Sequence, residues 1–482
     1  MTDSTPKPST RPVITFVIVS IGLFMVTLDN LVVSTALPVI RVDLNAPLES
    51  LEWMVNAYTL SFAVFLLTGA ALGDRFGRRK MFALGVVIFS LASAAAALAP
   101  DADTLVIARA IQGFGAALVA PLSLTLLSEA VPDGKRGLAI GAWSGVSGLG
   151  VAMGPVIGGA ITEGISWQWI FWINVPIGLV IAPLAAWRLI ESFGPDRGLD
   201  PRGLVLAVVG LFPLTFGVVR SSALGWGSAT VLISIAFGLV MMFFFLLHEG
   251  RTKEPMLPLR FFRSRAFSAT NAVSFVMFFG IFGSIFFLSQ FFITVQGYTP
   301  LEAGMRILPW TAMPIFVAPI AGLLSDRIGA RPLMVSGLAL QAFAIAWIAT
   351  ISEVDTAYIE FVPAFIAGGA GMALVFAPSA NAVLSAVRPI EAGKASGATN
   401  AIRELGGVAG VAVLASVFAA AGGYASPQDF VDGIRAALPV GAVVLLIGAF
   451  VALLIPRKGA PGTIASPRTD AAHQGGSVPS AL

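Results

Sequence analysis

The residue in this sequence with the most evident chemistry is Asp29, a carboxylate inside the long apolar run from Ile14 to Ile40. Placing such a group at membrane depth costs about 2.5 kcal/mol or more, so acidic residues there are rare and are functional by default. The chemistry open to Asp29 is the uptake and release of a proton. The alternative is a structural ion pair that joins two helices, and this alternative also requires a cationic partner.

Arg109 is the first candidate for that partner. It lies about six residues from the outer end of its predicted helix, and Asp29 lies about nine residues from the outer end of its own, so their depths are comparable at ~1.5 Å per residue. Gln112, one turn further on, extends the polar face of the Arg109 helix. We therefore expect a buried Asp29–Arg109 pair rather than an arginine that extends to the outer surface.

Two more charges, Arg403 and Glu404, stand about eight residues inside a later apolar run. Neighbouring residues on a helix point about 100° apart, so these two need not pair with each other. Glu404 is therefore a second candidate proton-coupling residue, with Arg403 beside it.

The composition places these charges in a membrane. The chain has 482 residues, of which 57% are hydrophobic and 11% charged, whereas a soluble domain carries roughly 25% charged residues. Continuous apolar runs, rather than alternating polarity, favour helices over a β-barrel. With no cysteine, two histidines and no nucleotide-binding loop, the sequence predicts neither a metal site nor an enzyme. The small excess of basic residues follows the membrane orientation and does not indicate nucleic acid as a partner.

The apolar runs predict an all-α membrane protein with roughly fourteen transmembrane helices of ~20 residues each. The predicted spans are 14–38, 53–72, 80–99, 104–128, 138–162, 169–190, 202–220, 229–247, 267–292, 302–324, 332–351, 357–385, 396–420 and 434–455. No cleavage site follows the polar start of the chain, so we expect the first helix to be retained.

Lysine and arginine set the orientation. All but six of the 29 Lys and Arg residues fall at predicted cytoplasmic positions, which places both termini in the cytoplasm. The exceptions are Arg41, Arg109, Arg220, Arg306, Arg403 and Arg435.

A weak repeat divides the chain. The segment 73–79, with an Asp-Arg pair, Gly77 and Arg79, resembles the segment 325–331, and each follows a corresponding helix, as in a duplicated transporter. We expect a six-helix bundle over 1–190, two inserted helices with cytoplasmic linkers over 191–265, a second six-helix bundle over 266–456, and a disordered cytoplasmic tail over 457–482.

The first copy of this loop is unusually charged. The positive-inside rule accounts for its basic residues but not for Asp74 or Gly77. Asp74 can cap the next helix or its positive end and pair with Arg78. We expect a latch that holds the two halves closed on the cytoplasmic side, formed within the motif Gly73, Asp74, Arg75, Gly77, Arg78 and Arg79.

The fifth span is rich in glycine around a proline. Glycines four residues apart allow close helix packing, and proline removes a backbone hydrogen bond and kinks a helix. Tight packing alone is the simpler reading, but the combination favours a helix that moves or seals. The residues are Gly150, Gly154, Pro155, Gly158 and Gly159.

Together these segments resemble the major facilitator superfamily, in particular its fourteen-helix drug:proton antiporter branch. Asp29 with the following Ala36-Leu37-Pro38 resembles the first-helix signature of that branch, Asp74 to Arg79 the cytoplasmic-loop motif, Arg109 to Gly113 the proton-coupling motif, and Gly150 to Gly159 the antiporter motif. The segments 169–176 and 297–304 are also similar to this branch. The chain departs from the family at Ala70, Gln168 and Glu404.

The resemblance implies a bacterial inner-membrane antiporter that exports amphipathic or cationic drugs by alternating access. Its energy source would be the proton gradient, without a cofactor; its partners would be the lipid bilayer, protons and a small-molecule substrate, and we assume a monomer. The alternatives are a dedicated exporter of a metabolite or lipid and, in another class, a non-transporting scaffold or sensor. Polar residues of the spans that could line a substrate cavity, or equally hydrogen-bond between helices, are Asn56, Tyr58, Asn271, Gln290 and Asn381.

Overall fold

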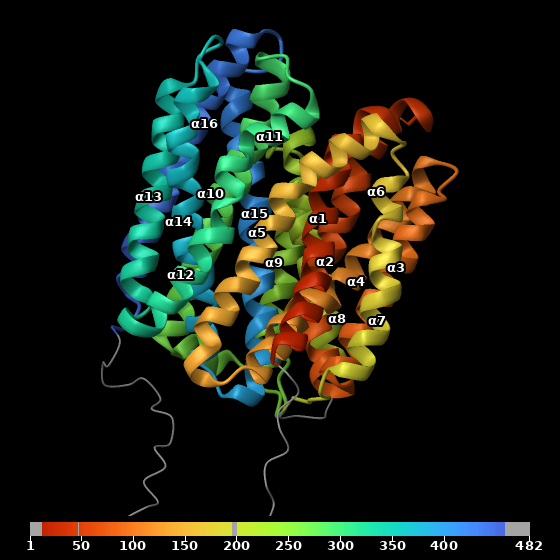
Figure 1. Ribbon diagram of the computed structural model, residues 1–482, viewed down its shortest axis with the longest axis vertical. Coiled ribbons are helices and arrows are strands. Elements are labelled where there is room, and N and C mark those ends of the chain that lie inside the picture. Colours follow the sequence, from red (N-terminus) through yellow and green to blue (C-terminus); the bar gives the residue numbers. More distant parts are fainter. Residues whose placement is uncertain (1–11, 47, 195–199, 458–482) are drawn as a thin grey trace, which may run out of the picture.

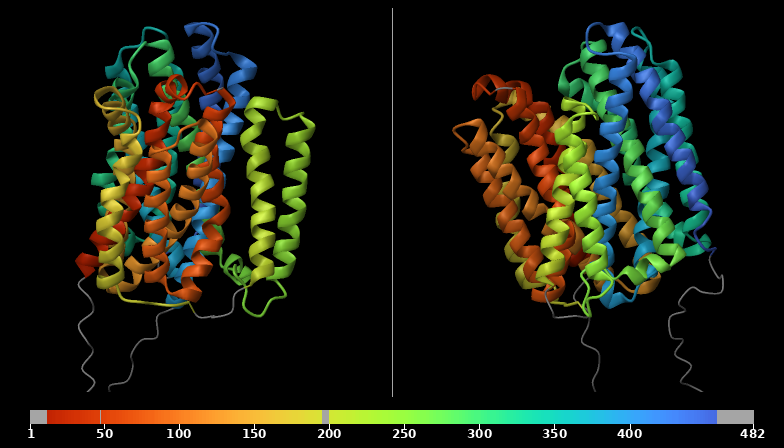
Figure 2. Two further views of the ribbon diagram at one scale, coloured as in Figure 1. Left: turned by 90° about the vertical axis from the view of Figure 1, so that its right-hand side faces the viewer. Right: turned by 180° about the vertical axis from the view of Figure 1, so that it is seen from behind.

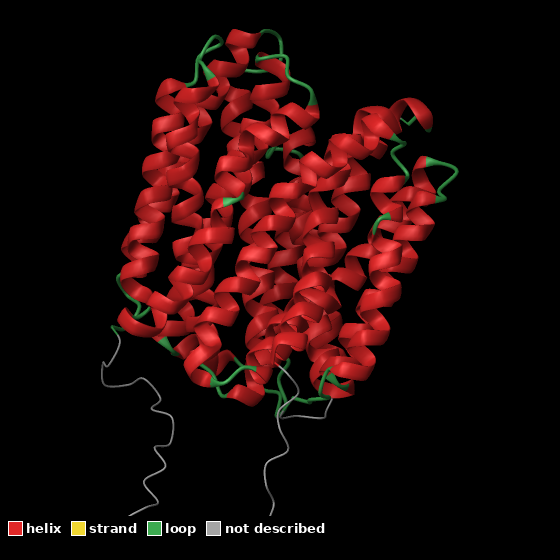
Figure 3. Cartoon of the chain, in the orientation of Figure 1, coloured by secondary structure: helices red, strands yellow, loops and turns green. Residues whose placement is uncertain are grey.

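The computed structural model describes residues 12–46, 48–194 and 200–457, and all regular structure within them is helical (Figures 1 and 3). The helices are α1 (Pro12–Asp43), α2 (Leu48–Phe76), α3 (Arg78–Ala97), α4 (Ala102–Ala130), α5 (Asp133–Gly164), α6 (Trp169–Trp172), α7 (Asn174–Arg188), α8 (Pro201–Leu224), α9 (Ala229–Glu249), η1 (Leu259–Arg263), α10 (Arg265–Gln290), η2 (Phe291–Val295), α11 (Pro300–Thr311), α12 (Met313–Ile328), α13 (Ala330–Ile351), α14 (Tyr358–Ser385), η3 (Pro389–Glu391), α15 (Ala392–Ala421) and α16 (Pro427–Ala452).

Fourteen helical segments in the described residues are long and apolar enough to cross a membrane, which confirms the predicted fold class. Two spans predicted as single helices are interrupted. The span 169–190 is divided into α6 and α7, and the span 302–324 into α11 and α12, where Pro314 occupies the first turn of α12. Proline lacks an amide hydrogen and therefore favours a helix start. Most of the predicted tail, 458–482, lies outside the described residues.

The transmembrane helices form two bundles that stand side by side, with an inserted helix pair at their edge (Figures 1 and 2). Helices α1–α7 pack on one another, as do α10–α16. The inserted helices α8 and α9 pair with each other, and α8 contacts both α2 of the first bundle and α15 of the second. We call these bundles the first and second half, and the end at which α1 begins and α16 ends the inner end.

Helices α5 and α15 form the seams between the halves. Helix α5 packs on α11 and α12, and α15 packs on α2. A Cβ added at Gly141 would lie 2.5 Å from the carbonyl oxygen of Ala318, and one at Gly397 would lie 2.6 Å from the Cβ of Ala70. Because neither seam has room for a further methyl group, the closeness of the halves depends on glycine.

The two seam helices carry the same glycine spacing. The later two glycines of each seam helix face the first helix of the same half. On α5, Gly154 lies against Leu31 of α1, and on α15, Gly410 lies against the Phe279 backbone of α10. The internal duplication therefore extends from the loops into the seam helices. The matching sets are Gly137, Gly141, Gly150 and Gly154 on α5, and Gly393, Gly397, Gly406 and Gly410 on α15.

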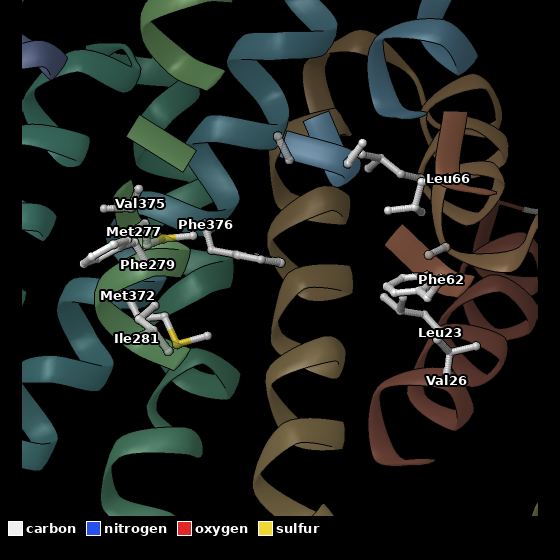
Figure 4. Packing of buried hydrophobic residues seen from close by; sticks show 14 of the residues in the cluster. Leu23, Val26, Phe62, Leu66, Met277, Phe279, Ile281, Met372, Val375 and Phe376 are labelled. Carbon is white, nitrogen blue, oxygen red and sulfur yellow. The ribbon is translucent and has the colours of Figure 1, made fainter. Parts of the chain in front are cut away.

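Apolar side chains fill both halves and also cover the outside. Figure 4 shows two groups of buried side chains, one that includes Leu23 and Phe62 on α1 and α2, and one that includes Met277 and Phe376 on α10 and α14. Exposed apolar side chains are frequent on α9, where only 17% of the span is buried. Lipid tails are as apolar as these side chains, so such a face is stable in a bilayer.

The orientation can be tested with reporter fusions. We expect fusions at Gly198 and Gly459 to report the cytoplasm, and a fusion at Asp355, in the exposed turn between α13 and α14, to report the outside. The physical reason is the retention of Lys and Arg on the cytoplasmic side during insertion. Alkaline phosphatase and green fluorescent protein fusions at each position provide opposite readouts, and an external signal at Gly459 would contradict the prediction.

Candidate functional site

Asp29 lies at the centre of a buried polar cluster in the first half. Its side chain and that of Arg109 are fully buried and form an ion pair through Oδ2 and Nη1. The other carboxylate oxygen, Oδ1, accepts hydrogen bonds from Gln112 Nε2 and Asn174 Nδ2, each at 2.8 Å. The structure thus brings together Asp29, Arg109 and Gln112, the three residues that the sequence places on two different helices.

Arg109 is held inside the bundle and does not reach the outer surface. Its Nε donates to the Met54 carbonyl oxygen at 3.1 Å, and Nη1 also donates to Gln112 Oε1 at 2.7 Å. The guanidinium carbon lies 4.2 Å from the centroid of the Tyr58 ring, a cation–π distance. Among the described residues Nη2 has no hydrogen-bond partner. The Nη2 amino group is therefore a buried donor of the guanidinium that makes no hydrogen bond within this cluster.

Asn174 and Ser93 complete the cluster, and neither was predicted as a site residue. Asn174 Nδ2 donates to Ser93 Oγ at 3.0 Å, and Ser93 Oγ donates to the Phe171 carbonyl oxygen at 2.8 Å. Asn174 is the first residue of α7, directly after the break at Ile173. The sequence does show an amide side chain, that of Asn174, within an apolar span. The break in the helix is what directs this side chain to Asp29.

A second polar cluster, which we call the inner latch, lies at the inner end. Arg78 is fully buried, donates to Asp74 Oδ1 from Nε at 2.8 Å, and forms an ion pair with Glu129. Its Nη2 donates to the carbonyl oxygen of Ile390 at 2.8 Å. Because Ile390 belongs to the second half, Arg78 joins the two halves at this end.

Asp74 pairs with Arg78 but does not cap the next helix, so that part of the expectation is wrong. The N-cap of α3 is Gly77, which has φ 105° and makes no side-chain capping bond. Instead, Asp74 faces the N-terminus of α15, where a Cβ on Gly393 would overlap its carboxylate. The amino end of a helix carries partial positive charge and stabilises a carboxylate there.

Three further loop residues have described contacts outside the second half. The Arg75 guanidinium lies 5.2 Å from the Phe76 ring centroid. The Arg79 backbone amide donates to Glu191 Oε1 at 2.9 Å, and a Cβ at Gly73 would overlap Leu122 of α4. Within the loop motif, Asp74 and Arg78 have partners across the seam.

The second copy of the loop makes the equivalent contact in the opposite direction across the seam. Asp326, at the inner end of α12, accepts a hydrogen bond from Asn381 Nδ2 at 2.9 Å. A Cβ on Gly137, in the first turns of α5, would overlap the Asp326 carboxylate. Each half thus places an aspartate against the start of the other half's seam helix.

The five polar residues expected to line a cavity do not come together. Tyr58 lies beneath Arg109, with its hydroxyl 3.2 Å from the Val26 carbonyl oxygen. Asn271 donates to the Phe267 carbonyl oxygen of its own helix at 2.9 Å. Asn381 lies on α14 and donates to Asp326 at the inner end, as described above, and Gln290 hydrogen-bonds to Tyr424 at the outer end. Asn56 is half-buried.

Arg403 and Glu404 point in different directions, as neighbours on a helix do. Arg403 is 2% exposed and donates to Ser379 Oγ at 2.8 Å. Glu404 is half-buried, makes no salt bridge with Arg403 among the described residues, and lies close enough to Tyr58 for an electrostatic interaction. Tyr58 belongs to the first half, so the charge of Glu404 acts across the boundary between the two halves.

The glycine motif of α5 packs directly beside the Asp29 cluster. A Cβ at Gly150 would overlap Thr27 Oγ1, and one at Gly154 would lie 2.8 Å from Leu31 Cβ. Both contacts fall within two residues of Asp29 along α1. Gly159 contacts Leu301 of α11 in the second half, and the Gly158 carbonyl oxygen accepts from Thr162 Oγ1 at 2.6 Å. The side chain of Pro155 lies outside the described side chains.

Known proteins with similar sequences are transport and resistance proteins. The chain is 35% identical to the tetracenomycin C resistance and export protein of Streptomyces glaucescens, over 88% of this chain and 79% of that protein. It is 33% identical to the puromycin resistance protein pur8 of Streptomyces alboniger, over 96% and 93%. It is 30% identical to the multidrug efflux pump LfrA of Mycolicibacterium smegmatis, over 100% and 95%.

Solved structures share the fold at low sequence identity. The proton:xylose symporter XylE superimposes with a TM-score of 0.67 at 16% identity, over 92% of this chain and 96% of that chain. The human organic anion transporter MFSD10 superimposes with a TM-score of 0.64 at 15% identity, over 92% and 100%. The family model of the Major Facilitator Superfamily matches residues 19–411 and 316–475. The chain therefore belongs to the Major Facilitator Superfamily, and it is a multi-pass membrane transporter, not an enzyme.

Proposed function

We propose that this protein is a proton-coupled antiporter that exports amphipathic, often cationic, small molecules from a bacterial cytoplasm across the plasma membrane. The observation that carries the proposal is the fully buried Asp29–Arg109 ion pair in the membrane-spanning first half. Such a pair is costly to bury, which makes a purely structural role a weak explanation. The resistance and export functions named for the similar bacterial proteins support export as the direction.

Proton coupling would follow from the bonding of Asp29. Protonation would remove the negative charge that compensates Arg109, and an uncompensated buried charge is unfavourable by several kcal/mol. The cluster joins α1, α4 and α7 through Asp29, Gln112 and Asn174, so its rearrangement would shift these helices. Helix α5, packed on α1 through Gly150 and Gly154, would carry this shift to the seam.

Alternating access would then use the inner latch. With both termini in the cytoplasm, the Arg78–Ile390 bond would close the cytoplasmic side. Opening that side would require Arg78 to lose this partner and Asp74 to leave the start of α15. A scaffold or sensor would need neither device, which argues for a transporter that cycles between two open states.

The energy source is the first test. Collapsing the pH gradient and the membrane potential with a protonophore is expected to stop export, because the exchanged proton supplies the driving force. The measurement is efflux of a panel of lipophilic cations from preloaded cells, compared with cells that lack the transporter. Export that continues in vesicles supplied with ATP but held without a proton gradient would refute proton coupling.

A further inference from the structure

The inserted helix α9 ends in a buried carboxylate, and the loop after it reaches a buried lysine of the second half. Glu249, the last residue of α9, is 3% exposed, and its Oε2 accepts a hydrogen bond from the Leu257 amide at 2.8 Å. Two residues earlier in the same loop, the Pro255 carbonyl oxygen accepts a hydrogen bond from Lys394 Nζ at 2.7 Å. Lys394 lies in the first turn of α15 and is 6% exposed. The loop therefore holds a carboxylate of the inserted pair near the start of a seam helix.

Lys394 also lies beside the inner latch. A Cβ on Gly393, the residue before it, would overlap the Asp74 carboxylate. Lys394 is close enough to Asp74 and to Glu249 for an electrostatic interaction with each. Among the described residues, each carboxylate has one buried oxygen without a hydrogen bond, Oδ2 of Asp74 and Oε1 of Glu249. One ammonium group therefore lies near two carboxylates, one from the first half and one from the inserted pair.

The other titratable groups described near Glu249 bond to each other. They are Asp200, the N-cap of α8, and His248, whose Nε2 lies 2.8 Å from Asp200 Oδ2. Both belong to the inserted pair. Lys394 is therefore the cation that approaches Glu249 from outside this pair.

The inserted pair stands at the edge of the two halves (Figure 2) and is bonded to the second half at both of its ends. At the inner end, Arg260 of the loop after α9 forms an ion pair with Glu391, directly before α15. At the outer end, Trp226, in the turn between α8 and α9, donates from Nε1 to Ser416 Oγ of α15. Helix α8 also packs on α2 of the first half, but these bonds join the pair to α15. We therefore expect the inserted pair to stay with the second half when the halves separate at the inner end.

We propose that Lys394 exchanges its carboxylate partner when the inner end opens: Asp74 leaves with the first half, and Glu249 becomes the main counter-charge. This assignment rests on the alternating access proposed above and gives the inserted pair a role in it. A buried cation that loses its partner is unfavourable. Glu249 is thus a positioning residue that lowers the free energy of the state in which the inner end is open.

The test is the rate at which a cysteine at the inner end reacts with a thiol reagent, measured on the purified full-length protein without substrate or gradient. The chain has no native cysteine, and Ser396 is fully buried at the start of α15, so Ser396→Cys reports opening. Glu249→Gln is expected to slow labelling about threefold to tenfold, because the open state loses its counter-charge while the closed state keeps Asp74. The amide still accepts the Leu257 bond. Glu254→Gln, an exposed glutamate of the same loop, is the matched control and should leave the rate unchanged.

A second arm removes the other carboxylate. Asp74→Asn weakens the closed state and is expected to speed labelling at least about threefold. In that background Glu249 is the counter-charge in both states, so Glu249→Gln should change the rate less than about twofold. A purely structural role of Glu249 would slow labelling equally with and without Asp74. Glu249→Asp keeps the charge but withdraws it by one methylene group, and it should slow labelling by only about twofold.

Unchanged labelling in both Glu249 variants, or equal slowing by Glu249→Gln with and without Asp74, would overturn the exchange of partners. A single symmetric peak in size-exclusion chromatography shows that a variant is folded. Failure of the proposed alternating access is distinguishable, because Arg78→Ala tests the latch itself. If Arg78→Ala speeds labelling and the Glu249 variants do not slow it, the latch stands and the exchange is wrong. If Arg78→Ala leaves the rate unchanged, the latch and the exchange that rests on it are both wrong.

Discussion

Asp29→Asn is expected to reduce export against a concentration gradient to the background of cells without the transporter, while the amount of protein in the membrane stays near normal. The amide keeps the shape of the side chain but cannot be ionised, so no proton is exchanged there. Arg109 retains its acceptors on Met54 and Gln112, which limits the structural cost. Efflux of a lipophilic cation and quantitative immunoblotting of membranes measure the two quantities.

Asp355→Asn, in an exposed turn, is the matched control and should export normally. Loss of the protein from the membrane in Asp29→Asn would show that the carboxylate is structural. Full activity of Asp29→Asn would indicate that Glu404, and not Asp29, couples proton movement to export, and Glu404→Gln then tests that role. If the double variant exports as well as the less active of the two single variants, the two residues share one proton path. Additive losses would indicate two independent roles.

Arg78→Ala is expected to open the inner end and to reduce export at least about tenfold. The substitution removes the bond to Ile390 across the seam and leaves two carboxylates, Asp74 and Glu129, without their common partner. Breaking a buried pair by removing one partner costs about 3–5 kcal/mol, enough to shift a conformational equilibrium strongly. Arg78→Lys keeps the charge but not the three-way geometry, and it should have an intermediate effect.

The opening can be measured by thiol labelling, because the chain has no native cysteine. Ser396 is fully buried at the start of α15 and donates to the Pro121 carbonyl oxygen of α4, across the seam. Ser396→Cys should react about tenfold faster with a cytoplasmic thiol reagent in the Arg78→Ala background. Arg79→Ala, whose described partners lie outside the second half, is the control. Equal labelling rates of Ser396→Cys alone, with Arg78→Ala and with Arg79→Ala would show that Arg78 does not hold the inner end closed.

Much of the fold and part of the site follow from local sequence alone. A long apolar run has to be a helix in a bilayer, because its backbone groups have no water to bond with. This is why fourteen spans could be counted correctly without contacts. Asp29 and Arg109 were identifiable for a related reason: a charge at membrane depth requires a partner, and few cations were available.

Helix breaks and cross-bundle contacts were not predictable in the same way. The break at Ile173 that directs Asn174 to Asp29 was not predicted, although Pro176 lies in the first turn of α7, where proline favours a helix start. Asp74 was expected to cap α3, but it lies at the start of α15, more than 300 positions later in the sequence. Sequence separation carries no information about which helix ends meet, since that depends on how whole bundles pack.

The sequence by itself therefore determined the fold class, the number of spans and the residues whose burial demands an explanation, because these follow from the cost of placing polar groups in an apolar solvent. Only the tertiary structure decided their partners: Asn174 for Asp29, Ile390 for Arg78, and Phe376 for Arg403. Nothing in the local sequence around each of these residues marks it as the partner of a buried charge. It acquires its role from the close approach of two helices, and that approach depends on the glycines and side-chain volumes of both surfaces at once.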